Sequence, residues 1–212
     1  MRKTSRTVGL ALSLGLFASS LSAQSISIGL RGSGSFPTGS FSETQGSTAD
    51  TALIQGAKNG FGYGLDVGLG IGMFGLYAGF DHVQFDCETT TCRTDGKYTL
   101  QGVTVGLKVA VPMMSRLSPF VKGGVTFNDL QGGYGGSSSN RLSTDRTPGY
   151  EVGAGIDVSL LGLLSFTPQL RYIGQNLKAK IPGVTTPTTA TEQGVKYFTF
   201  DLGLAVHTPF GK

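Results

Sequence analysis

The chain of 212 residues lacks tryptophan, has only two cysteines and two histidines, and carries charge on just 14% of its residues. It has no cluster of the ligands that a zinc site needs. The formal net charge is +4, but three of the basic residues, Arg2, Lys3 and Arg6, stand at the N-terminus. The other 14 basic and 13 acidic residues nearly balance. The sequence therefore gives no basic patch for nucleic acid, and no phosphate-binding loop leads into a helix.

The first 23 residues have the features of a secretory signal peptide. Basic residues precede a short apolar core, Val8–Phe17, and mostly small residues follow over Ala18–Ala23. Cleavage after Ala23 leaves Gln24 as the first residue, and cleavage after Ser22 is the alternative. An uncleaved anchor is less consistent with the sequence, because the apolar core is shorter than the roughly 20 residues of a spanning helix.

Eight later segments alternate apolar residues with glycine or polar residues. In residues 61–71, aromatic and aliphatic side chains fall on one face of a strand and Gly or Asp on the other. Beyond His82 the apolar Val83 and Phe85 interrupt this alternation, which predicts a bulge or a strand end. The predicted strands cover residues 25–36, 61–71, 75–85, 97–111, 118–128, 149–160, 164–176 and 196–210.

The segments between these strands alternate in length, long and then short. Outer-membrane barrels have short periplasmic turns, longer external loops and an even number of strands. No segment after the leader resembles a spanning helix, and a membrane protein without such helices must be a closed barrel. We predict an all-β protein whose residues 24–212 form an eight-stranded antiparallel up-and-down transmembrane β-barrel in the bacterial outer membrane. The alternative is a soluble lipocalin-type barrel, but the glycine-rich polar face suits a narrow lumen better.

Aromatic residues near the strand ends are expected to form the girdles at the two membrane interfaces. The predicted members are Phe36, Phe74, Tyr98, Phe120, Tyr150, Tyr172, Phe198 and Phe210.

Several segments resemble the small outer-membrane β-barrel family, which groups OmpX-like and Ail-like proteins with the OmpA transmembrane domain. They are GLYAGF (75–80), SPFVKGGV (118–125), GYEVGAGIDV (149–158) and LRY (170–172). The last strand also resembles the C-terminal assembly signal of such barrels. The resemblance covers essentially the whole chain after the leader. It implies insertion by the barrel-assembly machinery, contact with outer-membrane lipid and lipopolysaccharide, and a monomer.

Nine charged residues have the parity of the polar, inward face. They are Arg31, Asp66, Asp81, Lys108, Lys122, Glu151, Asp157, Arg171 and Asp201. Because an unpaired buried charge is costly, and because eight strands enclose just enough space for side chains, we expect a structural network of ion pairs. The alternative is a gated ion path through pairs that exchange partners.

The cysteines and histidines indicate a disulfide and a possible enzymatic base less strongly than the alternation indicates the barrel. An even number of cysteines in an exported protein predicts a disulfide between Cys87 and Cys92. A metal site there would need at least two more ligands, and only acidic residues are near. His82 is the candidate base of a lipid-modifying enzyme, whereas His207 has no obvious Ser or acid partner in the sequence.

Specificity in such a barrel is expected to reside in the external loops, which are rich in Ser, Thr and Gly. We therefore predict a non-enzymatic protein with an envelope-structural or surface-interaction role and a possible extracellular ligand at its loops. No cofactor and no nucleic-acid partner are expected. The alternatives are a narrow or gated pore and, less favoured, a lipid-modifying outer-membrane enzyme.

Overall fold

Nine strands and one short helical turn make up the described part of the chain. The structure is a computed structural model, and it describes residues 24–43, 54, 56–87, 96–111, 116–133, 141–180 and 192–210. Within these ranges no helix is long and apolar enough to cross a membrane. The elements are β1 (Gln24–Thr38), η2 (Gly39–Phe41), β2 (Ala57–Ile71), β3 (Phe74–Cys87), β4 (Lys97–Ala110), β5 (Leu117–Gly133), β6 (Arg141–Thr144), β7 (Thr147–Leu161), β8 (Leu164–Lys180) and β9 (Glu192–Phe210).

The predicted signal peptide, residues 1–23, lies outside the described residues. The division of the chain into a leader and a barrel domain therefore stays a prediction.

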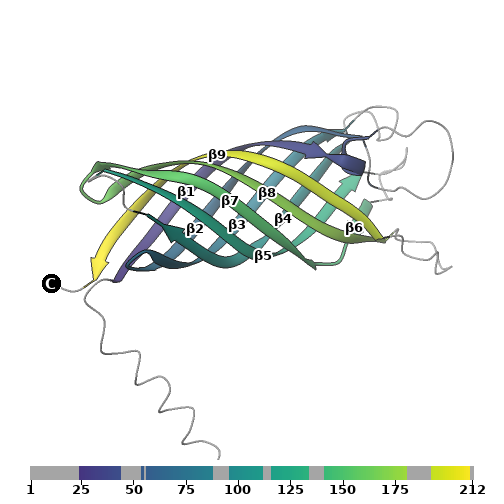
Figure 1. The fold of residues 1–212 in the computed structure, drawn as a ribbon. Helices are drawn as coiled ribbons and strands as arrows, with labels where there is room; N and C mark the ends of the chain where they lie inside the picture. Colours follow the sequence, from purple (N-terminus) through teal and green to yellow (C-terminus); the bar gives the residue numbers. More distant parts are fainter. Residues whose placement is uncertain are drawn as a thin grey trace, which may run out of the picture.

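The strands close into a barrel in which each neighbour is antiparallel (Figure 1). β1 pairs with both β2 and β9, and the order around the barrel otherwise follows the chain. The short β6 pairs with β5 and β8, as β7 does, and a two-residue break separates it from β7. β6 and β7 together thus occupy one of the eight strand positions around the barrel. The predicted eight-stranded up-and-down barrel is confirmed.

The two ends of the barrel differ. Two-residue turns join β2 to β3 and β7 to β8 at one end, with Gly72 and Gly162 in the left-handed region that glycine adopts without strain. Gln24 and Phe210 pair at this same end, while the strand ends that the longer connections join, such as those of β3 and β8, lie at the other (Figure 1). Short turns are periplasmic in outer-membrane barrels, so this end faces the periplasm.

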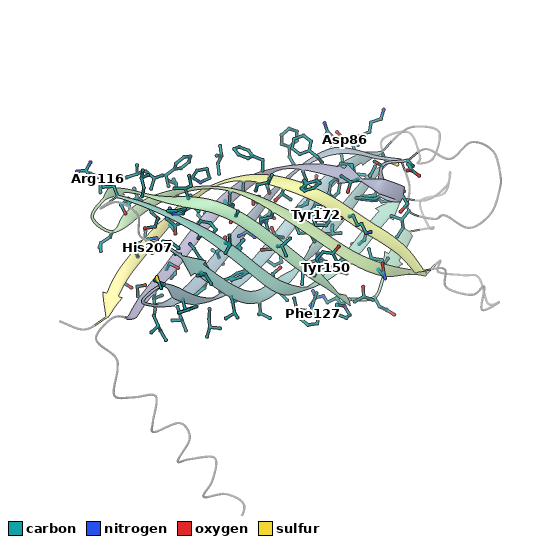
Figure 2. The ribbon with its side chains drawn as sticks, in the orientation of Figure 1. Asp86, Arg116, Phe127, Tyr150, Tyr172 and His207 are labelled. Atoms are coloured by element: carbon teal, nitrogen blue, oxygen red, sulfur yellow. The ribbon has the colours of Figure 1, made fainter. Side chains whose placement is uncertain are left out.

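The outer face changes from apolar to polar along the barrel. The periplasmic and central part carries a belt of exposed apolar side chains, in which Leu30 is 67% exposed. Exposed or half-buried aromatic residues end this belt on the extracellular side, as Tyr150, Tyr172 and Phe127 show in Figure 2. Further out, the outward positions are polar, such as Gln84 on β3 and Lys196 on β9. This change marks the outer boundary of the membrane.

The inner face changes in the opposite sense at the same boundary. β3 neither bulges nor ends after His82: its register with β4 continues from Phe74 to Asp86 without a shift. Val83 and Phe85 keep their inward parity and are buried. The predicted irregularity was wrong because the polarity of the surroundings changes while the alternation of the strand does not.

Two predicted girdle residues, Tyr98 and Phe120, face the interior and are buried. The inversion explains Tyr98, which lies in the extracellular section. Phe120 lies near the periplasmic end instead, where its ring packs inside the barrel under the Lys108 ammonium. A register shift does occur on the neighbouring strand β2, whose pairing with β3 shifts between Ala57 and Gly60.

Glycines in the lumen make space for large side chains that cross it. A Cβ on Gly106 would lie 2.7 Å from a ring carbon of Tyr77, and one on Gly124 would lie 2.8 Å from the Tyr77 hydroxyl. A Cβ on Gly155 would lie 2.6 Å from the ring of Phe120. The high glycine content of the inward face is therefore a packing requirement.

Gly106→Ala is expected to destabilise the folded barrel by about 1–3 kcal/mol, the usual cost of overpacking. The added Cβ would also lie 2.3 Å from the carbonyl oxygen of Gly123. Gly32→Ala is the matched control, since a Cβ there meets nothing within 4 Å, and it should change stability by less than about 0.5 kcal/mol. Urea titrations followed by circular dichroism would measure both, and equal midpoints would contradict the packing argument.

Candidate functional site: the charged lumen

Arg171 on β8 lies at the centre of the lumen and is only 1% exposed. Its guanidinium donates five hydrogen bonds to three carboxylates. Nε and Nη2 contact Asp201 at 2.6 and 3.1 Å, Nη1 and Nη2 contact Asp81 at 3.1 and 3.0 Å, and Nη1 contacts Glu151 at 2.9 Å. A planar fork with five donors suits this convergence, because β3, β7 and β9 supply the three acceptors from different sides.

Two more cations extend the cluster around Arg171. Arg31 pairs with Asp66 and, through Nη2, with Asp81 at 2.8 Å. Lys122 Nζ lies 3.1 Å from Glu151 Oε1, which also accepts a hydrogen bond from the Tyr77 hydroxyl at 3.1 Å. We call the seven charged residues of this cluster the central network; they are Arg31, Asp66, Asp81, Lys122, Glu151, Arg171 and Asp201.

Lys108 and Asp157 form a separate ion pair, with Nζ and Oδ2 2.6 Å apart. The Lys108 ammonium also lies 3.9 Å from the centre of the Phe120 ring. Thr167 donates a hydrogen bond to the other oxygen of Asp157 at 2.9 Å. The structure thus places all nine predicted charged residues in the lumen, seven in the central network and two in this pair.

An apolar cluster lies in the lumen on the extracellular side of the central network. Phe41 of η2 and Ile54 enter the barrel from the first long connection, and both are buried. Phe41 packs edge-on against Phe85, with ring centres 5.1 Å apart, and Phe85 contacts Tyr197 at 5.3 Å. The apolar cluster comprises Phe41, Ile54, Ala57, Val83, Phe85, Tyr98, Leu100, Leu130, Ile173, Leu177, Val195 and Tyr197.

Sequence analysis did not predict this cluster. The signal was the apolar pair Val83 and Phe85 on an otherwise polar face, together with apolar residues in a polar loop. Nothing local showed that Phe41 and Ile54 fold back into the barrel.

The histidines occupy different surroundings from those expected. His82 faces outward, where its ring stacks on Tyr63 with centres 5.0 Å apart and its Nε2 lies 3.3 Å from Gln84 Nε2. Asp81, the adjacent acid, points into the lumen instead. His207, for which the sequence offered no partner, lies 2.7 Å from the Ser165 hydroxyl through Nε2. That earlier expectation was wrong because the partner comes from the neighbouring strand.

Cys87 ends β3, and Cys92 lies outside the described residues. The Cys87–Cys92 disulfide therefore stays a prediction. In the part of the chain that the structure describes, no three His, Cys, Asp or Glu side chains are placed to hold a metal ion.

A closed antiparallel barrel with an apolar belt outside and paired charges inside is a transmembrane barrel of the outer-membrane type. The chain matches the outer membrane protein beta-barrel domain family over residues 8–207. It belongs to that family, and its location is the bacterial outer membrane. No curated protein matches the sequence.

Several solved structures are similar to this one. OprG from Pseudomonas aeruginosa has 15% identity and a TM-score of 0.54, with 88% of this chain and 96% of that chain covered. Neisserial surface protein A has 14% identity and a TM-score of 0.52, with 86% and 96% covered. Ail of Yersinia pestis has 17% identity and a TM-score of 0.48, with 89% and 100% covered. At these identities the likeness to OprG and to Neisserial surface protein A shows the fold alone. The family supports a surface or envelope role in general.

Proposed function

We propose that this protein is a non-conducting, non-enzymatic barrel that acts in envelope structure or in surface interaction through its extracellular part. The observation that carries this proposal is that two layers of side chains, one charged and one apolar, fill the lumen. The central network occupies the middle of the barrel, with Arg171 and Glu151 each 1% exposed. The apolar cluster fills the extracellular section above it, with Phe41, Phe85 and Leu100 fully buried.

The two layers oppose conduction for different physical reasons. An ion that passes the central network must separate charge pairs whose partners have no water to replace them, and that loss is expensive. The same ion must then cross an apolar layer that offers it no compensating oxygen or nitrogen. Together they support a sealed barrel more strongly than either does alone.

The extracellular section supports a surface role. A strand of about 9 to 11 residues crosses the membrane, whereas β8 has 17 residues and β9 has 19. The excess length forms a section with polar residues outside and an apolar core inside, which is the arrangement of a water-soluble protein. Such a section holds the loops above the lipid on a rigid base, and loops on a rigid base commonly carry binding specificity.

The same proposal includes the partners that a barrel in the outer membrane would meet. Lipid and lipopolysaccharide surround the belt, the barrel-assembly machinery inserts the chain, and an extracellular ligand contacts the loops of a monomer. The lipid-modifying alternative finds no support at His82, whose described contacts are Tyr63 and Gln84.

Single-channel recording in a planar bilayer tests the proposal. The refolded protein, residues 24–212, should give no reproducible conductance steps after insertion. Resistance of the same sample to added protease, together with heat-dependent migration on gels, would show that the barrel is folded. Regular steps from a folded sample would overturn the sealed barrel and favour the gated-pore alternative, in which the partners of Arg171 exchange.

A further inference from the structure

The periplasmic half of the lumen contains a cavity of about 330 Å³. It begins among the periplasmic turns at Gly72 and Gly162 and extends inward to Arg31 and Asp66. The central network closes its inner end. The cavity is therefore a dead-end pocket accessible from the periplasm, at the small end of the volumes found for small-molecule sites.

The residues that line the pocket carry one more positive than negative charge, although the central network as a whole contains more carboxylates than cations. Three cations line it, Arg31, Lys108 and Lys122, against two carboxylates, Asp66 and Asp157. The carboxylates that surround Arg171 lie deeper and do not line the pocket. An anion entering from the periplasm would therefore meet a net positive surface in a confined, partly desolvated space, where charge interactions are stronger than in water.

Two lysines of the pocket are direct cross-strand neighbours. Lys108 on β4 pairs in register with Lys122 on β5, and both side chains point inward. Like charges placed directly opposite each other on a sheet destabilise it. Each lysine has its own carboxylate, Asp157 for Lys108 and Glu151 for Lys122. An anion near this pair would relieve the remaining repulsion.

The Lys108 ammonium can still donate hydrogen bonds to a further acceptor. Its side chain is 27% exposed, and Asp157 takes one of the three N–H donors of its ammonium. His207 and Ser165, hydrogen-bonded to each other, line the same pocket and add polar groups on the opposite wall.

We propose that this pocket binds a small oxyanion from the periplasm, a carboxylate or a phosphate, with Lys108 as its principal contact. Size limits the ligand to a compact molecule, and the positive lining selects its charge. Asp157 competes with the ligand for the Lys108 ammonium. Because of this competition, replacing Lys108 and replacing Asp157 should change the affinity for the oxyanion in opposite directions.

Calorimetric titration of the refolded barrel in a non-ionic detergent would test it, with sodium phosphate and sodium acetate as separate probes. Both would be titrated at constant ionic strength in a buffer without oxyanions. At least one probe should bind saturably at one site per barrel, and the two titrations distinguish phosphate from carboxylate as the preferred group. Lys108→Gln should weaken that binding at least tenfold. Lys196→Gln removes an exposed lysine from the outer face and should leave it unchanged.

Asp157→Asn distinguishes binding from a structural role. Loss of the competing carboxylate should tighten binding several-fold while the amide keeps the pocket filled. If Lys108 and Asp157 only hold the barrel together, both substitutions should weaken binding alike. That result, an unchanged affinity in Lys108→Gln, or the absence of saturable binding with both probes would overturn the proposal.

Discussion

Arg171→Met is expected to destabilise the barrel by roughly 3–5 kcal/mol, the cost of removing one partner from a buried ion pair. The substitution does not leave the three carboxylates around Arg171 equally unpaired. Asp81 keeps Arg31, and Glu151 keeps Lys122. Asp201 is 0% exposed, and its ion pair in the described part of the chain is with Arg171. The loss should therefore arise mainly from an uncompensated charge at Asp201, and urea titration followed by circular dichroism would measure it.

Two further variants locate the cause. Asp201→Asn added to Arg171→Met removes the uncompensated charge and should recover a large part of the lost stability. Arg146→Met removes an arginine whose side chain is 62% exposed and paired with Asp129, and it should cost no more than about 1 kcal/mol. A central network of little structural importance would instead give Arg171→Met and Arg146→Met similar unfolding midpoints, and the second substitution would recover nothing.

The strands and the inward parity of the charged residues could be predicted because both depend on a period of two. A strand exposes alternate residues to lipid and lumen, so each charge between apolar neighbours must point inward. The pairing could not be predicted. Arg171 meets Asp81 across the lumen, 90 residues away in the chain, and that contact depends on strand tilt and stagger, which leave no local mark on the sequence.

The errors at Phe85 and Tyr98 share one cause. The prediction assumed that lipid surrounds every strand along its whole length, so inward apolar residues such as Phe85 looked like an irregularity. Tyr98 was likewise assigned to the girdle on its position alone. Once the strands leave the membrane, water replaces lipid around the barrel, and the hydrophobic effect favours apolar side chains on the inside. Phe41 and Ile54 join them from a connection without periodicity, which no pattern could reveal.

Phe85→Ala tests this inversion and is expected to cost about 3–5 kcal/mol, as for a large aromatic residue in a packed core. Phe85 is fully buried and contacts Phe41 from one side and Tyr197 from the other. Its neighbour Gln84 supplies a matched control on the same strand. Gln84 points outward into water, and Gln84→Ala should change stability by less than about 0.5 kcal/mol.

The comparison decides between two views of the extracellular section. If the section has a true apolar core, the two adjacent substitutions should differ in free energy of unfolding by several kcal/mol, measured by the same urea titration. If Phe85 merely lines an open, loosely filled mouth, Phe85→Ala should cost little more than Gln84→Ala. Because the central network lies below the cluster, Phe85→Ala should remain non-conducting in a bilayer, and conductance from it would show that the apolar layer alone seals the lumen.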